Sequence, residues 1–348
     1  MKTVLEILSV LILIAGLIPI IKNDHWIFRV FDYPRFQKLF VCLIILVLWL
    51  FLGFSDFGKL DYILFIGVVM MAIFQMYQIY PFTIFSPKMV KDTGSGSDFP
   101  TISVMVINVY QYNKDYQKAL KLIQREDPDI LLLAETDLNW AKEMSEFKNS
   151  HPHFVEIPQE NTYGMLFYSK LPILEYEVQH LIDQEIPSIE ALVKLQSGDN
   201  VKIFAIHPTP PVPSENPTST ERDAEILLVG KKVKHYDKPT LVMGDLNDVG
   251  WSYTSELFLK ISGLLDPRRG RGMFNTFHAK YFFLRWPLDH IFVSKHFTLD
   301  NLKIHHNIGS DHFPISAGFS LKPMNDNENF EAEEEEKEEA DQKIANGK

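Results

Sequence analysis

The sequence opens with three long apolar runs, which cover residues 7–21, 39–54 and 62–80. With its flanks, each run comes close to the roughly 20 apolar residues that an α-helix needs to cross a bilayer. Aromatic residues favour the membrane interface, and five lie near the ends of these runs: Trp26, Trp49, Tyr62, Tyr77 and Tyr80. No small-residue cleavage site follows the first run, which disfavours a signal peptide. The pattern therefore predicts a membrane anchor of three transmembrane helices within residues 1–90.

The pattern changes after residues 91–98 (KDTGSGSD), a stretch whose Gly and Ser content is typical of a flexible linker. The apolar runs beyond it are short and bounded by turn residues, which indicates buried strands. Eight such strands are expected, at 102–107, 130–134, 164–168, 189–195, 201–206, 240–243, 288–293 and 315–319. Helical spacing of apolar residues predicts helices at 114–125 and 220–233. We expect one globular α/β domain over residues 99–321.

The net charge of −11 is unevenly distributed. Residues 325–348 hold ten acidic and three basic residues and few apolar ones, so that residues 322–348 are predicted to form an acidic, disordered tail. The domain itself is mildly acidic, which argues against the avid, non-specific duplex binding that a basic surface supports. Cys42 is the single cysteine, so the chain has neither a disulfide framework nor a cysteine-based zinc site.

The basic residues of the short loops favour one orientation of the anchor. Six Lys or Arg residues lie in the first loop or just after the third run, and two lie on the opposite side. Because basic loops tend to stay in the cytoplasm, this count favours a cytoplasmic domain. The margin is narrow, so the side of the membrane stays open. The sequence thus predicts a multi-pass protein of the cell membrane.

Polar residues follow four of the expected strands: Asn108, Glu135, His207 and Asp245. Two later segments add Asp289-His290 and Asp311-His312. Loops at the ends of packed strands are common places for functional sites. Carboxylates and amides are hard oxygen donors that suit Mg²⁺ or Mn²⁺, and histidines can contact a phosphate. The set predicts metal-assisted hydrolysis, whereas a Ser-His-Asp triad would require a serine at a nucleophile elbow, and none is present.

Taken singly, these positions have ordinary structural explanations. The Gly-Asp-x-Asn of TLVMGDLND, residues 240–248, is common turn chemistry. Glu135 at a strand exit could be a surface acid. The repetition of such residues at strand ends favours the catalytic interpretation. Arg285, Trp286 and His290, which flank the start of the strand at 288–293, are expected to line the substrate pocket.

Six segments of this domain resemble a known superfamily in their order along the chain: VINVY, LLLAET, IHPTPP, GDLND, PLDHIFVS and GSDHFPI. Over residues 101–319 the sequence is similar to the endonuclease/exonuclease/phosphatase superfamily, which includes DNase I-like nucleases, inositol polyphosphate 5-phosphatases and neutral sphingomyelinases. Three spans before such a domain resemble a bacterial membrane-anchored branch. The resemblance implies a four-layer α/β sandwich (DNase I-like), with the site at the shared edge of two sheets.

The resemblance also implies a cofactor, Mg²⁺ (or Mn²⁺), and the residues that hold it. Glu135 would ligate the metal ion, with support from Asn108 and Asp311. The segment that carries His290 departs from the pattern, because many members have Tyr at this position.

The remaining roles are implied in the same way. Asp245 would orient or deprotonate the attacking water, and Asn247 would hold a phosphate oxygen. His312 would contact the phosphate, while Asp289 fixes the imidazole ring of His312. His207 occupies the second histidine position of the family and faces phosphate, but a proline-rich turn follows it in this chain. This turn is expected to shape a wall specific to the substrate.

Three functions remain open from the sequence. The leading one is a membrane-anchored phosphoesterase for a phosphomonoester or phosphodiester, and tethering to the bilayer favours a lipid-linked substrate. The second is a nuclease that acts on DNA or RNA. The third is a catalytically silent membrane scaffold, which would not need the polar set described above. The expected partners are the lipid bilayer and a phosphorylated substrate, and the sequence gives no sign of an obligate protein partner.

Overall fold

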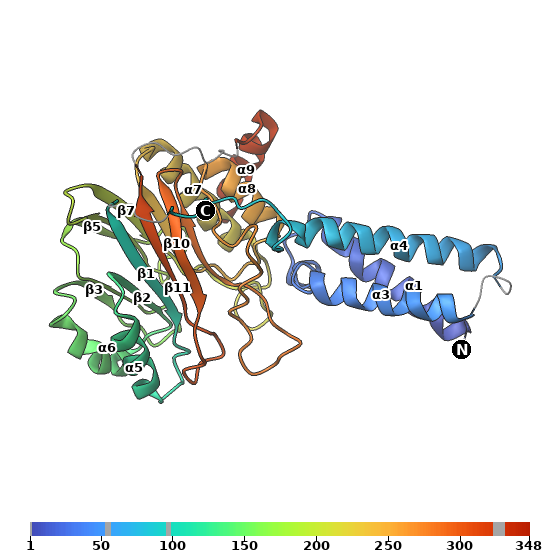
Figure 1. Cartoon of the computed structure of the whole chain (residues 1–348), viewed down its shortest axis with the longest axis horizontal. Coiled ribbons are helices and arrows are strands. Elements are labelled where there is room, and N and C mark those ends of the chain that lie inside the picture. Colours follow the sequence, from blue (N-terminus) through green and yellow to red (C-terminus); the bar gives the residue numbers. More distant parts are fainter. Residues whose placement is uncertain (1, 53–56, 95–98, 323–330) are drawn as a thin grey trace.

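The computed structural model describes residues 2–52, 57–94, 99–322 and 331–348. It places a bundle of three long helices beside a globular α/β domain (Figure 1). The bundle consists of α1 (Lys2–Leu17), α3 (Arg35–Leu52) and α4 (Lys59–Ile79). Short helical turns adjoin it: η1 (Ile18–Ile20), α2 (Trp26–Arg29) and η3 (Tyr80–Phe82).

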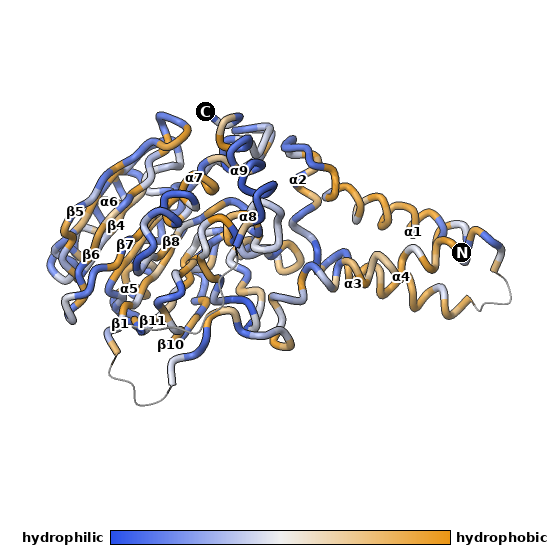
Figure 2. Tube along the Cα trace, turned by 90° about the horizontal axis from the view of Figure 1, so that it is seen from above, coloured by the Kyte–Doolittle hydropathy of each residue, from blue (hydrophilic) through white to orange (hydrophobic). Residues whose placement is uncertain are grey.

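The bundle is apolar both inside and on its surface. Its helices are hydrophobic over most of their length (Figure 2). Apolar side chains such as Ile14, Phe40 and Ile63 are exposed on its surface, while Cys42, Trp49 and Val68 fill its interior. Three segments are long and apolar enough to cross a membrane, namely Lys2–Ile20, Arg35–Leu52 and Lys59–Phe82. The three predicted helices are thus confirmed, although residues 53–54 at the end of the second run lie outside the described residues.

Two mixed sheets form the domain. The first has six strands in the order β10-β11-β1-β2-β4-β3, and the second has five in the order β5-β6-β7-β8-β9. The strands of the first sheet are β1 (Thr101–Asn108), β2 (Ile130–Ala134), β3 (His153–Ile157), β4 (Met165–Ser169), β10 (Phe297–Ile304) and β11 (Ile315–Leu321). Those of the second are β5 (Ile173–Gln179), β6 (Ser188–Lys194), β7 (Asn200–Ala205), β8 (Thr240–Asp245) and β9 (Asp289–Val293).

Helices cover the outer faces of both sheets. The helices of the domain are α5 (Tyr116–Glu126), α6 (Leu138–Met144), α7 (Thr220–Tyr236), α8 (Tyr253–Ser262) and α9 (Glu334–Gly347), with a short turn η4 (Ser145–Lys148). Successive residues of a strand point to opposite faces, so β2 contributes to two cores: Leu132 packs between the sheets, and Leu131 and Leu133 pack beneath α5 and α6. Phe204 and Val242 of the second sheet pack beneath α7 and α8. These layers confirm the predicted four-layer α/β sandwich.

The acidic tail differs from the prediction of disorder. Helix α9 is packed against α7 through Ala340 and Ile344, which are buried. Lys343 adds ion pairs to Asp24 at 3.2 Å and to Asp223 at 3.1 Å. The prediction rested on the low apolar content of the tail, which suggested that too little apolar surface could be buried. Ala340 and Ile344, however, are four positions apart and so lie on one face of a helix, and this face packs against α7. Residues 323–330 of the tail lie outside the described residues.

The expected linker is also partly structured. Asp92 forms a parallel bridge with Leu299 of β10, and the backbone N–H of Thr93 donates to the carbonyl oxygen of Leu299 over 2.9 Å. Residues 95–98 of the linker lie outside the described residues. The loop between α1 and α3 rests on the domain as well, because the indole N–H of Trp251 donates to the carbonyl oxygen of Asp32 over 2.9 Å.

Candidate active site

The first half of the candidate site lies where β1 and β2 end. The strands are parallel and their register pairs Asn108 with Ala134, so Glu135 follows directly beside Asn108. The side-chain amide of Asn108 donates to Glu135 Oε1 over 2.7 Å and to Asp245 Oδ2 over 2.9 Å. The amide oxygen of Asn108 accepts the backbone N–H of Tyr110 over 3.0 Å. Asn108 therefore positions carboxylates that come from two different sheets.

The second half is the edge of the five-stranded sheet. His207 lies just beyond β7, Asp245 ends β8 and Asp289 begins β9, where the antiparallel register pairs Asp289 with Asp245. Gly244 has a φ of 149°, and a Cβ atom there would lie 1.9 Å from the carbonyl oxygen of Ile206. Because only glycine tolerates this conformation and approach, Gly244 lets β8 run close to the segment that leads into His207.

His312 joins the two halves. Its Nδ1 lies 2.8 Å from Asp289 Oδ2, and its Nε2 lies 3.5 Å from Asp245 Oδ2. Its backbone N–H donates to Ser310 Oγ over 2.9 Å, and the Ser310 hydroxyl donates to the carbonyl oxygen of Asn108 over 2.8 Å. Burial alone would lower the pKa of His312, but the carboxylates of Asp289 and Asp245 outweigh it and raise the pKa to about 10. The imidazole is therefore protonated at neutral pH.

Negative charge is concentrated around this imidazolium. Burial raises the pKa of Glu135 to about 7, the hydrogen bond from Asn108 opposes this shift, and the charges of Asp245 and Asp311 add to it. Burial likewise raises the pKa of Asp245 and lowers the pKa of His207. The charge of Asp311 acts on the carboxyl of Glu135, so these two acids lie near one another.

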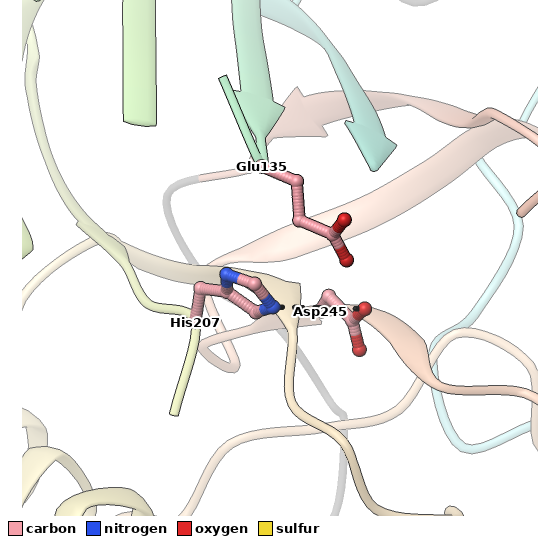
Figure 3. A group of neighbouring side chains, drawn as sticks. All are labelled: Glu135, His207 and Asp245. Carbon is pink, nitrogen blue, oxygen red and sulfur yellow. Dashed lines mark ion pairs between the residues drawn. The ribbon is translucent and has the colours of Figure 1, made fainter. Parts of the chain in front are cut away.

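Two groups of side chains have the spacing of a metal site. The ligand atoms of Glu135, His207 and Asp245 all lie within 4.8 Å of one another (Figure 3), and the same holds for Asp245, Asp289 and His312. His207 Nε2 lies 3.9 Å from Asp245 Oδ2. Among the described residues, no hydrogen-bond partner exists for two buried atoms, His207 Nδ1 and Asp289 Oδ1. Buried carboxylate oxygens and imidazole nitrogens at this spacing fit a divalent metal ion.

Asn247 fastens the turn after β8. Its backbone has a φ of 51°, a left-handed conformation that Asn tolerates well. Its backbone N–H donates to Asp245 Oδ1 and its side-chain amide donates to the carbonyl oxygen of Pro208, each over 3.0 Å. The carbonyl oxygen of Asn247 accepts hydrogen bonds from Tyr33 and Arg222, each over 2.8 Å. The turn is therefore held by the proline-rich segment, by α7 and by the loop between α2 and α3.

His290 does not line the site, so this part of the prediction is wrong. The side chain is fully buried, with Nδ1 2.7 Å from Arg268 Nη2 and Nε2 2.8 Å from the carbonyl oxygen of Asp248. Burial and the Arg268 charge lower the pKa of His290 to about 3. The reason is the geometry of β9: Asp289 and His290 are consecutive, and consecutive side chains of a strand point to opposite faces.

The other two predicted pocket residues lie beside the site. Phe277 stands between Trp286 and His312, with its ring centroid 6.1 Å from that of Trp286 and 5.0 Å from that of His312. The Arg285 guanidinium lies over the ring of Phe313 at 4.9 Å. Contact of Arg285 or Trp286 with a substrate stays a prediction.

Sequence reasoning missed several residues that support the site. The ring of Tyr163 lies 5.4 Å from that of His207, and the backbone N–H of Gln111 donates to Glu135 Oε2 over 3.4 Å. Tyr33 and Arg222, which hold the turn after β8, were missed as well. None of these residues follows an expected strand, and their proximity to the site arises from tertiary packing.

Solved structures share this fold at low sequence identity. An endonuclease/exonuclease/phosphatase family protein from Bacteroides thetaiotaomicron aligns with a TM-score of 0.54 and 19% identity over 65% of this chain and 100% of that chain. D. rerio TDP2, complexed with a single strand DNA product, aligns with a TM-score of 0.54 and 17% identity over 64% of this chain and 99% of that chain. The protein from Beutenbergia cavernae DSM 12333 gives a TM-score of 0.52 and 15% identity over 64% of this chain and 72% of that chain.

Sequence comparison supports the same assignment. No curated protein sequence matches the chain. The sequence profile of the Endonuclease/Exonuclease/phosphatase family, however, matches residues 105–312. This match spans more than half of the chain and runs from β1 to His312, the stretch that contains the carboxylates and histidines described above. The chain therefore belongs to the endonuclease/exonuclease/phosphatase family.

Proposed function

We propose that the protein is a membrane-anchored phosphoesterase that depends on Mg²⁺ or Mn²⁺ and hydrolyses a phosphomonoester or phosphodiester. Family members are typically metal-dependent hydrolases of phosphoesters. The observation that carries the proposal is the network centred on Asp245, whose carboxylate accepts from Asn108 over 2.9 Å and lies 3.5 Å from His312. This network unites polar residues from the ends of both sheets in one buried cluster.

The cation would be held mainly by Glu135, with Asp311 beside it and Asn108 fixing the Glu135 carboxylate. When bound, it supplies positive charge to the phosphate oxygens and to the departing oxygen, which phosphoester hydrolysis requires. Neither Glu135 nor Asp311 has a basic side chain bonded to its carboxylate among the described residues, so both retain capacity for a cation.

The remaining residues act on the water and the phosphate. Asp245 is placed to accept a proton from the attacking water. His312, protonated and oriented by Asp289, donates a hydrogen bond to a phosphate oxygen and stabilises the charge that builds there. Asn247 uses one amide hydrogen on Pro208 and keeps a second for the phosphate. His207, whose Nε2 lies 3.9 Å from Asp245 Oδ2, contributes a further contact to phosphate.

A lipid-linked phosphate is the favoured substrate because the anchor holds the site near a bilayer and concentrates it there. A nuclease is the second candidate, supported by the likeness to D. rerio TDP2 with its single strand DNA product. The acidic balance of the chain, with a net charge of −11, works against strong binding of a polyanion.

The test uses the full chain in detergent micelles with bis-p-nitrophenyl phosphate, plasmid DNA or mixed-micelle phospholipid, each with Mg²⁺, Mn²⁺ or EDTA. We expect metal-dependent turnover that EDTA abolishes. Glu135→Ala should abolish it, whereas Glu177→Ala, an exposed glutamate on β5, should leave it unchanged. Asp245→Ala and His312→Ala should each lower turnover by at least about a hundredfold.

The outcomes separate the candidates. Cleavage of DNA alone would favour the nuclease. No metal-dependent turnover of any of the three substrates would overturn the enzyme proposal and favour a scaffold. Full activity of Glu135→Ala would remove Glu135 from the metal site.

A further inference from the structure

The loop between Phe277 and Trp286 carries an exposed apolar tip. Four consecutive side chains at residues 281–284 are largely open to solvent: Tyr281 is 58% exposed, Phe282 71%, Phe283 76% and Leu284 48%. Single exposed apolar residues are common on proteins, but a contiguous group of this kind marks an interaction surface. We name residues 281–284 the apolar tip.

The apolar tip lies next to the membrane anchor. The side-chain amide of Gln37, in the first turn of α3, donates to the carbonyl oxygen of Phe283 over 2.8 Å. Phe36 and Phe40 of the same helix are 52% and 56% exposed. In Figure 1 the orange loop that leads into β9 projects from the domain on the side that carries the bundle. The tip is therefore continuous with the apolar surface of the anchor, at the end of α3 nearest the domain.

Basic residues flank the apolar tip. Lys280 precedes it and Arg285 follows it, and the Arg285 guanidinium lies 5.4 Å from the ring of Phe282. Aromatic side chains with adjacent lysine or arginine are typical of segments that lie in the membrane interface, where the rings enter the acyl boundary and the cations meet anionic headgroups.

The base of the same loop touches the candidate site. The backbone N–H of Ala279 donates to the carbonyl oxygen of Asp311 over 2.6 Å. Phe277 bridges to His312 in an antiparallel pair, and their rings lie 5.0 Å apart. A short stretch of chain thus connects the apolar tip to two residues of the site.

We propose that the apolar tip inserts into the interface of the bilayer that holds α1, α3 and α4, and that its partner is lipid. Insertion holds the domain against the surface of the bilayer. The side of the site that carries Asp311 and His312 then lies next to the lipid headgroups. The consequence for substrate access rests on the phosphoesterase function proposed above, whereas the insertion itself does not.

Insertion is tested with the full chain in phosphatidylcholine and phosphatidylglycerol vesicles. A bimane label is placed by Phe283→Cys in a Cys42→Ala background, and a control label by Tyr176→Cys on β5, which lies on the side of the domain away from the bundle (Figure 1). We expect lipid-borne nitroxide to quench the label at position 283 at least about fivefold more than the label at 176, and aqueous iodide to show the reverse.

Equal iodide quenching at both positions would overturn insertion. Shielding of position 283 from both quenchers would indicate a protein partner, such as a second copy of the chain, and would overturn it too. If lipid quenches the label at position 283 but the chain hydrolyses no phosphoester, the phosphoesterase proposal is overturned. The insertion proposal is supported by the same result.

The effect on access is tested with the double variant Phe282→Ser/Phe283→Ser. We expect turnover of vesicle phospholipid to fall at least about tenfold, with unchanged turnover of soluble bis-p-nitrophenyl phosphate. The matched control Leu174→Ser/Tyr176→Ser removes two exposed apolar side chains from β5 and should change neither rate. Vesicle turnover at the rate of the unaltered chain would overturn the role of the tip in access.

Discussion

Tyr33, in the loop between α2 and α3, donates its hydroxyl hydrogen to the carbonyl oxygen of Asn247 over 2.8 Å. A residue of the segment that joins the apolar helices therefore holds the turn that follows Asp245. The ring of Tyr33 also lies edge-on to that of Trp286, with centroids 5.6 Å apart. Burial raises the pKa of Tyr33, so its hydroxyl stays protonated and remains a donor at physiological pH. The segment between α2 and α3 thus contributes to the shape of the candidate site.

Tyr33→Phe should lower turnover of a soluble phosphoester about three- to tenfold, because one neutral hydrogen bond contributes about 1 kcal/mol. The loss should appear in kcat more than in KM, since Tyr33 acts by positioning Asn247 and Asp245. Steady-state kinetics of the full chain in micelles measures both. Tyr80→Phe is the matched control, because the Tyr80 hydroxyl bonds to the carbonyl oxygen of Phe85, away from the site. Equal kinetics for the two variants would rule out the positioning role.

The carboxylate of Asp289 should set the pH range of activity. Burial alone would lower the pKa of His312, but Asp289 and Asp245 raise it to about 10, so the imidazolium persists through neutral and mildly alkaline pH. Asp289→Asn removes one of these charges, and the alkaline limb of kcat/KM should move at least about one pH unit lower. A profile between pH 6 and 10 records the shift. Asp300→Asn, on β10, serves as the control, and an unmoved limb in Asp289→Asn would contradict the assignment.

The meeting of polar residues from distant segments could be predicted from the sequence, because local pattern and strand ends carry most of that information. The parallel register of β1 and β2 places Glu135 beside Asn108, and the pairing of Asp245 with Asp289 follows from the antiparallel contact of β8 and β9. Polar residues that follow strands are expected to lie close together when the ends of those strands lie at the same edge of a sheet.

Orientation and long-range packing could not be predicted in this way. Nothing in the order Asp289-His290 indicates which of the two faces the site, and a shift of one residue reverses the answer. Tyr33 was missed because the partner of a loop residue depends on how the helical bundle docks on the domain. The tail was misjudged because the partner of Ile344 is α7, more than 100 residues earlier in the chain.

Glu225 on α7 should make stability depend on pH. Its carboxyl is buried, Oε1 has no hydrogen-bond partner among the described residues, and burial raises its pKa to about 8. The unfolded chain ionises this group near its usual pKa of about 4.3, so the free energy of unfolding should fall as pH rises from there to about 8. Glu225→Gln removes this loss and should raise the apparent melting temperature at pH 8 more than at pH 5.

Thermal unfolding of the full chain in detergent at the two pH values measures this difference. Glu177→Gln changes an exposed glutamate of β5 and should shift the melting temperature at neither pH. A Glu225→Gln variant that is less stable than the unaltered chain at pH 8 would show that the carboxyl has a stabilising partner.

Ile344 should hold α9 to the domain. Its side chain is 6% exposed and packs with Ala340 against α7, and burial of an isoleucine contributes about 1.5–3 kcal/mol. Ile344→Asp would place a carboxylate in this apolar contact, so the amides of α9 should exchange with solvent at least about tenfold faster. Ala345→Asp introduces the same charge on the exposed face of the same helix and should leave exchange unchanged. Hydrogen exchange followed by mass spectrometry of peptides from residues 331–348 measures both variants. Equal protection in the two would mean that the ion pairs of Lys343 with Asp24 and Asp223, rather than the apolar contact, fix the helix.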